Sequence, residues 1–157
     1  MKRLLLYMAI MAAVLLIPVE RADVAKLHPV QTVALYKITE GYRIETDTGD
    51  IGSGATVDAA FADLKATTPG VIYLDTADYF LIAQDTESAA EEMRKYLKSG
   101  VQVCEIIGQG NLENISLFLS SHSGLPLFRK WEKGENLPLL DCRKEQIKFL
   151  QKNEKNT

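Results

Sequence analysis

The alternation of hydrophobic and polar positions near the start of the chain predicts a β-hairpin. Residues 30–38 mix β-branched and aromatic side chains, and residues 42–46 alternate in character, with Glu40 and Gly41 between the two runs. Residues 47–54 then hold three glycines and two aspartates, which favours an irregular turn over continued strand pairing. The hairpin is therefore expected to end in a glycine-rich loop.

Three segments place apolar side chains at helical spacing. Thr56 is a suitable N-cap for the first, and Asn111 is one for the third, which ends near Gly124. The second covers residues 87–99 and has an acidic start and a basic end, which suit the helix dipole. The apolar stripes consist of Val57, Ala60, Phe61 and Leu64 in the first helix, Ala89, Met93, Tyr96 and Leu97 in the second, and Leu112, Ile115 and Leu119 in the third.

Short apolar runs between these helices predict further strands. Residues 71–74 and 79–83 are typical of strands buried on both faces. Because strands alternate with helices at this spacing, we expect one α/β (α+β) domain, with a single mixed β-sheet and about three helices packed on it. The remaining strands are expected at residues 101–107 and 127–131, and in a terminal hairpin of residues 139–142 and 147–150.

The N-terminus has the organisation of an export signal. Lys2 and Arg3 precede an uncharged apolar run over residues 4–19. As a helix this run spans about 24 Å, which is short against a hydrocarbon core of about 30 Å and favours cleavage. No small-x-small site follows the run, however, so an uncleaved signal anchor is an equal alternative. We therefore assign residues 1–25 to a signal peptide or signal anchor, residues 26–150 to one globular domain and residues 151–157 to a polar tail.

Export would place the domain outside the cytoplasm, either anchored in the membrane or secreted. The whole chain has 18 Lys and Arg against 21 Asp and Glu, and without Lys2 and Arg3 the balance is 16 against 21, a net charge of −5. A nucleic-acid binder needs a basic face that replaces the counterions of the phosphates. The charge therefore argues against a general nucleic-acid binder.

Cys104 and Cys142 are the only cysteines. An oxidising compartment would permit them to form a disulfide, whereas the simpler interpretation is two separate buried thiols. Their spacing is not that of a metal site, and His28 and His122 are too isolated to supply one. The sequence therefore predicts no metal and no other cofactor.

Asp47-Thr48-Gly49 is the sequence feature most suggestive of catalysis. An Asp-Thr-Gly loop supplies one carboxylate of an aspartic protease, in which two such carboxylates share a proton and activate water. A second carboxylate could come from another copy of the chain or from Asp75. Asp50 follows where the protease loop has a small residue, and the predicted helices do not fit that nearly all-β fold. A turn that uses Asp and Gly for local hydrogen bonds is the favoured interpretation.

The two acidic loops also suggest an ion-binding site. Asp47 and Asp50 lie in one loop and Asp75 and Asp78 in the other, and their carboxylates could bind Ca²⁺ if the loops met in space. The spacing lacks the alternating aspartates and the closing Glu of a calcium loop. These four residues are weak candidates for binding an ion or small ligand, and solvated turn residues are the favoured interpretation.

The central block of the chain resembles the N-terminal domain of the Ger(x)C-type spore germination proteins, the lipoprotein C subunits of germinant receptors. The shared features are a strand pair, a Gly-x-Thr-Val/Ile-x-x-Ala helix start, a Tyr-Leu/Phe element leading into a short apolar strand, and an amphipathic helix. They correspond here to the segment from Gly54 to Leu64, to Tyr73-Leu74, to Tyr79-Phe80-Leu81-Ile82-Ala83 and to the segment from Ala89 to Leu97.

The chain also departs from that family. It has no lipobox cysteine, Asp75 and Asp78 occupy a loop that is often basic or histidine-containing in the family, and the long C-terminal region of the receptor subunit is missing. The resemblance covers about half of the chain. It implies a free-standing relative of the N-terminal domain, exported from a spore-forming Gram-positive cell and held near the membrane, with no catalytic residues to carry over.

The sequence as a whole predicts a non-enzymatic, membrane-proximal domain. The expected role is in sporulation or spore germination, through contacts with other membrane or spore-envelope proteins. Two alternatives stay open. One is an exported aspartic-type hydrolase that uses Asp47 as a homodimer, and the other is an ion-binding or small-ligand-binding module that uses the acidic loops.

Overall fold

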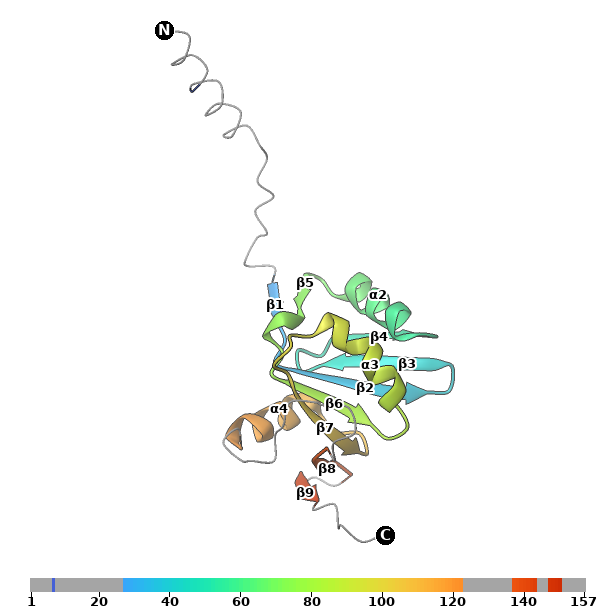
Figure 1. Ribbon diagram of the computed structural model, residues 1–157, viewed down its shortest axis with the longest axis vertical. Coiled ribbons are helices and arrows are strands. Elements are labelled where there is room, and N and C mark those ends of the chain that lie inside the picture. The colour runs from blue at the N-terminus through green and yellow to red at the C-terminus, as the bar shows by residue number, and fades with distance from the viewer. Residues whose placement is uncertain (1–6, 8–26, 123–136, 144–146, 151–157) are drawn as a thin grey trace.

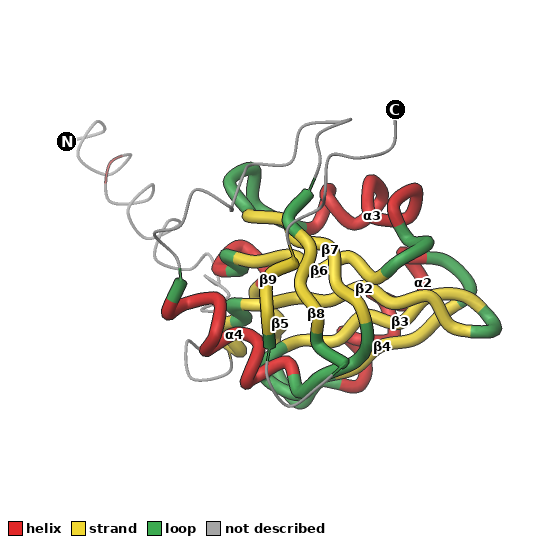
Figure 2. The backbone as a smooth tube through the Cα atoms, turned by 90° about the horizontal axis from the view of Figure 1, so that it is seen from below, coloured by secondary structure: helices red, strands yellow, loops and turns green. Residues whose placement is uncertain are grey.

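The structure is a computed structural model that describes Tyr7 and residues 27–122, 137–143 and 147–150. Its main element is a seven-stranded mixed sheet with the order β4-β3-β2-β6-β7-β8-β9 (Figure 2). β2, β6, β7 and β8 run parallel, while β3, β4 and β9 pair antiparallel with their neighbours. The bounds are Thr32–Ile38 for β2, Gly41–Thr46 for β3, Ile51–Gly54 for β4, Tyr79–Ala83 for β6, Gln102–Ile107 for β7, Leu139–Asp141 for β8 and Lys148–Leu150 for β9.

Three α-helices cover the two faces of this sheet. α2 (Val57–Thr67) and α3 (Glu87–Met93) lie over one face, and the short 3-10 helix η3 (Arg94–Tyr96) continues α3. α4 (Leu112–Ser121) lies over the opposite face (Figure 1). The predicted mixed sheet with three packed helices is therefore confirmed.

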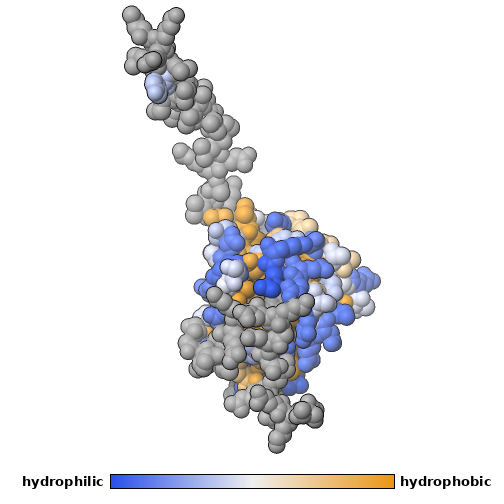
Figure 3. Space-filling view, in the orientation of Figure 1, coloured by the Kyte–Doolittle hydropathy of each residue, from blue (hydrophilic) through white to orange (hydrophobic). Residues whose placement is uncertain are grey.

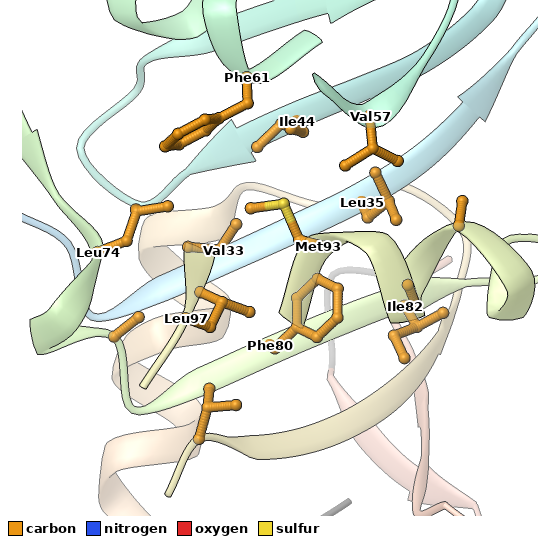
Figure 4. Packing of buried hydrophobic residues seen from close by; sticks show 14 of the residues in the cluster. Val33, Leu35, Ile44, Val57, Phe61, Leu74, Phe80, Ile82, Met93 and Leu97 are labelled. Atoms are coloured by element: carbon orange, nitrogen blue, oxygen red, sulfur yellow. The ribbon is translucent and has the colours of Figure 1, made fainter. Parts of the chain in front are cut away.

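The central strands have a hydrophobic core on each side. In β2, Val33 and Leu35 belong to the cluster under α2 and α3, whereas Ala34 and Tyr36 belong to the cluster under α4. Successive side chains of a strand point to opposite faces, so a strand buried on both faces needs apolar residues at every position. This explains the continuous apolar runs in β2 and β6. Met93 of α3 lies among Val33, Leu35, Phe80 and Ile82 in the larger cluster (Figure 4).

The hairpin and both predicted helix caps are confirmed. β2 and β3 pair antiparallel, and Gly41 at their junction has a φ of +137°, which a side chain would disfavour. The Thr56 side chain accepts a hydrogen bond from the Ala59 N–H at 3.1 Å. The Asn111 side chain accepts one from the Asn114 N–H at 3.2 Å. Each cap satisfies a backbone donor that the first helical turn leaves without a partner.

The prediction of an irregular turn throughout residues 47–54 is wrong, because residues 51–54 form β4. Gly52 and Gly54 have no side chains, so α2 packs directly on the backbone of this strand. Side chains of α2 also close the outer edge of β4. The Asp63 carboxylate accepts the Ser53 N–H at 2.9 Å, and the Thr67 hydroxyl donates to the Ile51 carbonyl at 3.2 Å. The sequence suggested that these glycines are turn residues. In the structure they allow a helix to pack closely on a strand.

The prediction that residues 71–74 form a strand buried on both faces is also wrong. Among the described strands, β5 (Val71–Tyr73) pairs with β1 (Leu27–Pro29) alone, in a separate parallel ribbon of two strands. The 3-10 turn η2 (Leu74–Thr76) follows, and the Thr76 hydroxyl donates to the Val30 carbonyl at 2.9 Å and accepts the Val30 N–H at 3.1 Å. These bonds hold the ribbon beside the start of β2 and outside the main sheet.

The predicted terminal hairpin is confirmed by the antiparallel pairing of β8 and β9. The second helix is shorter than predicted, since α3 ends at Met93 and η3 at Tyr96. The export segment over residues 1–25, the strand predicted at residues 127–131 and the polar tail over residues 151–157 lie outside the described residues. In the part of the chain that the structure describes, no helix has both the length and the apolar character needed to cross a bilayer.

A polar contact joins α2 to the end of α3. The Asp58 carboxylate accepts a hydrogen bond from the Tyr96 hydroxyl at 2.8 Å and pairs with the Lys95 ammonium at 2.5 Å. The Tyr96 ring lies 4.0 Å from the Phe61 ring, centroid to centroid. The hydrogen bonds from Lys95 and Tyr96 lower the pKa of Asp58. The ionised carboxylate therefore stabilises the contact between the two helices.

We predict that Gly52→Ala destabilises the protein. A Cβ at this position would overlap the Ala60 carbonyl oxygen and the Leu64 amide nitrogen, and backbone atoms cannot rotate away. The expected loss in the free energy of unfolding is about 1–3 kcal/mol, the usual cost of overpacking. Gly100→Ala is the matched control, since a Cβ there meets nothing within 4 Å. Urea unfolding of both variants checks this, and equal midpoints would contradict it.

We predict that the wild type is more stable than Asp58→Asn and that this difference in stability depends on pH. Because the folded pKa of Asp58 lies below the unfolded value of about 3.9, the stabilisation is fully present above that value and is lost as the pH falls through the folded pKa. The difference in Tm between the two proteins should therefore be present at neutral pH and vanish in strong acid. Thermal unfolding of both proteins from neutral pH to strong acid measures this difference, and a difference that persists unchanged in strong acid would contradict the prediction.

Candidate functional site

The Asp-Thr-Gly segment forms the turn between β3 and β4. The Thr46 N–H donates to the Asp50 carbonyl and the Gly49 N–H donates to the Thr46 carbonyl, each at 3.0 Å. The Thr48 hydroxyl donates to the Asp50 carboxylate at 2.7 Å. Gly49 has a φ of +86°, in the region that favours glycine. The residues of this turn thus satisfy one another, as the turn interpretation of the sequence expects.

The Asp47 carboxylate connects three parts of the fold. One oxygen accepts the Gln31 N–H at 3.2 Å, just before β2, and the other accepts the Ser116 hydroxyl of α4 at 3.1 Å. Ser116 is buried, with 5% of its surface exposed. Both carboxylate oxygens therefore hold structural contacts. Within the described residues, no carboxylate is hydrogen-bonded to Asp47 in the way that a shared-proton pair requires.

The second acidic loop lies beside the first, with Gln31 between them. The Gln31 carbonyl accepts the Asp78 N–H at 2.8 Å, while its N–H binds Asp47. The Asp78 carboxylate pairs with the Lys98 ammonium at 2.6 Å, and Asp75 is exposed. The loops therefore meet through backbone atoms, and Asp47 and Asp78 bind different partners. Within residues 27–122, 137–143 and 147–150, no three His, Cys, Asp or Glu side chains are placed to hold a metal ion.

The two cysteines are buried free thiols in the cluster under α4. Ile107 pairs with Asp141, so Cys142 lies about four residues further along the strand pair than Cys104. Four residues span about 13 Å, whereas the Cα atoms of a disulfide lie within about 7 Å of each other. The disulfide that export would permit is not formed. Burial raises the pKa of Cys104 to about 12 and that of Cys142 to about 11, so neither is a ready nucleophile near neutral pH.

A polar hollow of about 290 Å³ lies between β3, its following turn and the start of α4. Arg43, Glu45 and Asp47 line one side, and Asn111 and Glu113 line the other. Arg43 and Glu45 form an ion pair. A second hollow, of about 260 Å³, lies on the other side of Asn111, where Gln109, Asn114 and Arg143 contribute to its walls. The sequence did not indicate these hollows, because their walls come from separate segments, residues 43–51 and 110–113 in the first and residues 109–115 and 142–147 in the second.

Tyr36 pairs across β2 and β3 with Arg43, a residue that lines the first hollow. Its side chain is 3% exposed, and its hydroxyl has no hydrogen-bond partner among the described residues. Burial, and then the negative charge of Glu45, raise the pKa of Tyr36, so the phenol stays neutral. The Nε of Arg43 is also buried without a partner in the part of the chain that the structure describes. In the sequence Tyr36 was indistinguishable from any other apolar position of β2.

An apolar surface lies at one end of the domain, over β1 and β5. Hydrophobic residues gather there in the space-filling view (Figure 3). Val71 is 56% exposed and Tyr73 is 42% exposed, while Ile72 between them is buried. The chain enters the domain at the same end, because β1 begins at Leu27 (Figure 1). We call Val71, Ile72 and Tyr73 the β5 edge.

The fold defines an α+β protein with a mixed sheet covered on both faces. Comparisons with models of protein families, with curated proteins and with solved structures found no match.

We predict opposite effects for two Tyr→Phe variants on the α4 side of the sheet. Tyr36→Phe removes a buried hydroxyl that has no partner among the described residues and should raise the free energy of unfolding by up to about 1 kcal/mol. Tyr79→Phe removes the hydroxyl that donates to the Leu119 carbonyl at 3.3 Å and should lower it by about 1 kcal/mol. Urea unfolding at pH 7 measures both. A loss at Tyr36 as large as that at Tyr79 would show that the Tyr36 hydroxyl has a partner in solution.

Proposed function

We propose that the protein is a non-enzymatic, extracytoplasmic domain that lies close to a membrane and acts through contacts with other proteins, in sporulation or spore germination of a Gram-positive bacterium. The observation that carries this proposal is the exposed β5 edge, beside the point where the chain enters the domain. A β-branched and an aromatic side chain, 56% and 42% exposed, form an apolar surface there. Exposed apolar surface of this kind marks interaction sites.

The sequence before β1 supports a position close to the membrane. Residues 4–19 form the apolar run of the export signal, and residues 20–26 connect it to β1. Seven connecting residues extend over at most about 25 Å. If the apolar run stays in the bilayer, β1 and the β5 edge therefore lie within about 25 Å of the membrane surface. A partner that reaches this edge is then expected to be anchored in the same membrane.

The contacts of the acidic residues favour a binding role over catalysis. Asp47 binds Gln31 and Ser116, and Asp78 binds Lys98. An aspartic-type hydrolase needs two facing carboxylates, and an ion site needs carboxylates that are free to converge on the ion. The buried thiols are also protonated near neutral pH. These contacts give the candidate residues structural roles and support the proposal of a non-enzymatic domain.

The biological setting is proposed from the resemblance of residues 54–97 to the N-terminal domain of Ger(x)C-type germination proteins. The Thr56-capped helix α2 and the strand β6 fall within that block. A free-standing domain of this type would be exported and would contact other membrane or spore-envelope proteins.

We predict that Tyr73→Asp in the full-length chain weakens these contacts at least about tenfold. A charge at this position opposes burial of the β5 edge against a partner, and truncating an interface aromatic often costs 2 kcal/mol or more. The measurement is the rate at which spores of the variant strain lose absorbance after addition of germinant. Leu117→Asp is the matched control, because Leu117 is 65% exposed on α4, away from β5.

Three outcomes would count against the proposed function. One is that deletion of the gene leaves spore formation and the germinant response unchanged. The second is recovery of the protein in the cytoplasmic fraction of vegetative cells. The third is an equal effect of Tyr73→Asp and Leu117→Asp, which would remove the role of the β5 edge.

A further inference from the structure

The outer strands of the structure are protected to different degrees. An edge strand presents free backbone N–H and C=O groups that can pair with another strand. On β4 this edge is closed, since Asp63 and Thr67 of α2 bind the Ser53 N–H and the Ile51 carbonyl. β5 pairs with β1 on one side, and no described strand pairs with its other side. The same strand carries exposed Val71 and Tyr73.

We propose that β5 pairs antiparallel with β5 of a second copy of this chain, about a twofold axis at Ile72. In this arrangement Val71 lies opposite the partner's Tyr73, and Tyr73 lies opposite the partner's Val71. The inference rests on the proposed function, because it names the partner for the same apolar edge. It goes further by assigning the register of the contact.

The pattern of the strand suits pairing with itself. Exposure alternates as exposed, buried, exposed over the three residues, so the strand presents the same pattern in both directions. A twofold interface requires this kind of self-complementarity. Each of the two symmetric pairs joins a β-branched to an aromatic side chain, a combination that stabilises cross-strand contacts by roughly 0.2–1 kcal/mol. No charged residue occurs between Val71 and Tyr73.

Tethering to one membrane favours a second copy of the chain as the partner. If residues 4–19 stay in the bilayer, every copy carries its β5 edge at the same height above the membrane. Confinement to one surface raises the effective concentration of the copies. A pairing of two three-residue strands, marginal in solution, can then form.

Cysteine cross-linking of the full-length chain in phosphatidylcholine vesicles tests the register. Two variants are used, Val71→Cys and Tyr73→Cys, and one of them carries a tag that changes its mobility in a gel. Directly opposite positions in an antiparallel pair have Cα atoms about 4.5–5.5 Å apart, whereas diagonal positions are about 7–8 Å apart and exceed the usual disulfide range. The native chain is the control, because the raised pKa values of its buried thiols disfavour cross-linking.

We expect the mixture of the two variants to give a mixed disulfide dimer at least about fivefold more abundant than the dimer of either variant alone. Equal cross-linking in all samples would indicate random collision and overturn the proposed register. Thermal unfolding of each reduced variant shows whether it is folded, and both sites are exposed enough to accept cysteine. If Tyr73→Cys does not fold, the tagged native chain is compared with its Tyr73→Phe and Tyr73→Asp variants. Loss of dimers on vesicles in Tyr73→Asp but not in Tyr73→Phe would support the pairing.

The outcomes separate this inference from the proposed function. No mixed dimer, together with slowed germination in Tyr73→Asp, would overturn the self-pairing and leave contact with another protein in place. Protection of Tyr73→Cys from a water-soluble maleimide by vesicles, without any dimer, would overturn it in favour of a lipid contact. A mixed dimer in a strain that germinates normally with Tyr73→Asp would support the pairing and remove its proposed role in germination.

Discussion

The structure depends on β2, the strand that joins the antiparallel part of the sheet to the parallel part. β2 pairs antiparallel with β3 on one side and parallel with β6 on the other. It is buried on both faces, with Val33 and Leu35 under α2 and α3 and with Ala34 and Tyr36 under α4. A polar side chain on either face of such a strand is costly unless it is hydrogen-bonded. Its apolar composition is therefore the constraint that brings all three helices to the sheet.

The segment before β2 also positions the acidic loops. Gln31 donates to Asp47 and accepts from Asp78, so the two loops lie on either side of one backbone unit. Ser116 then connects Asp47 to α4 on the far face. The sequence suggested that each of these loops could supply half of a catalytic site. In the structure, both loops bind the segment at the start of β2. The carboxylates of Asp47 and Asp78 therefore hold structural contacts.

The strands β4 and β5 differ in how their outer edges are covered. β4 is closed by side chains of α2, whereas β5 lies in a ribbon of two strands with exposed apolar residues on it. Proteins usually protect their edge strands by coverage, charge or shortness, because open edges promote association. An edge that is apolar, uncovered and next to the entry of the chain therefore has the properties of a contact surface.

Local chemistry in the sequence determined much of this fold. The cap and stripe of α2, the β2–β3 hairpin and the apolar run of β6 depend on residues a few positions apart, and all three were predicted. The tertiary structure alone decided that Gly52 and Gly54 belong to a strand under α2, that β5 leaves the main sheet, and that Cys104 and Cys142 stay apart. It also decided that the Tyr36 hydroxyl is buried without a hydrogen-bond partner among the described residues. Each of these outcomes depends on which distant segments pack together, and a single sequence carries the propensities of its segments but not the pairing between them.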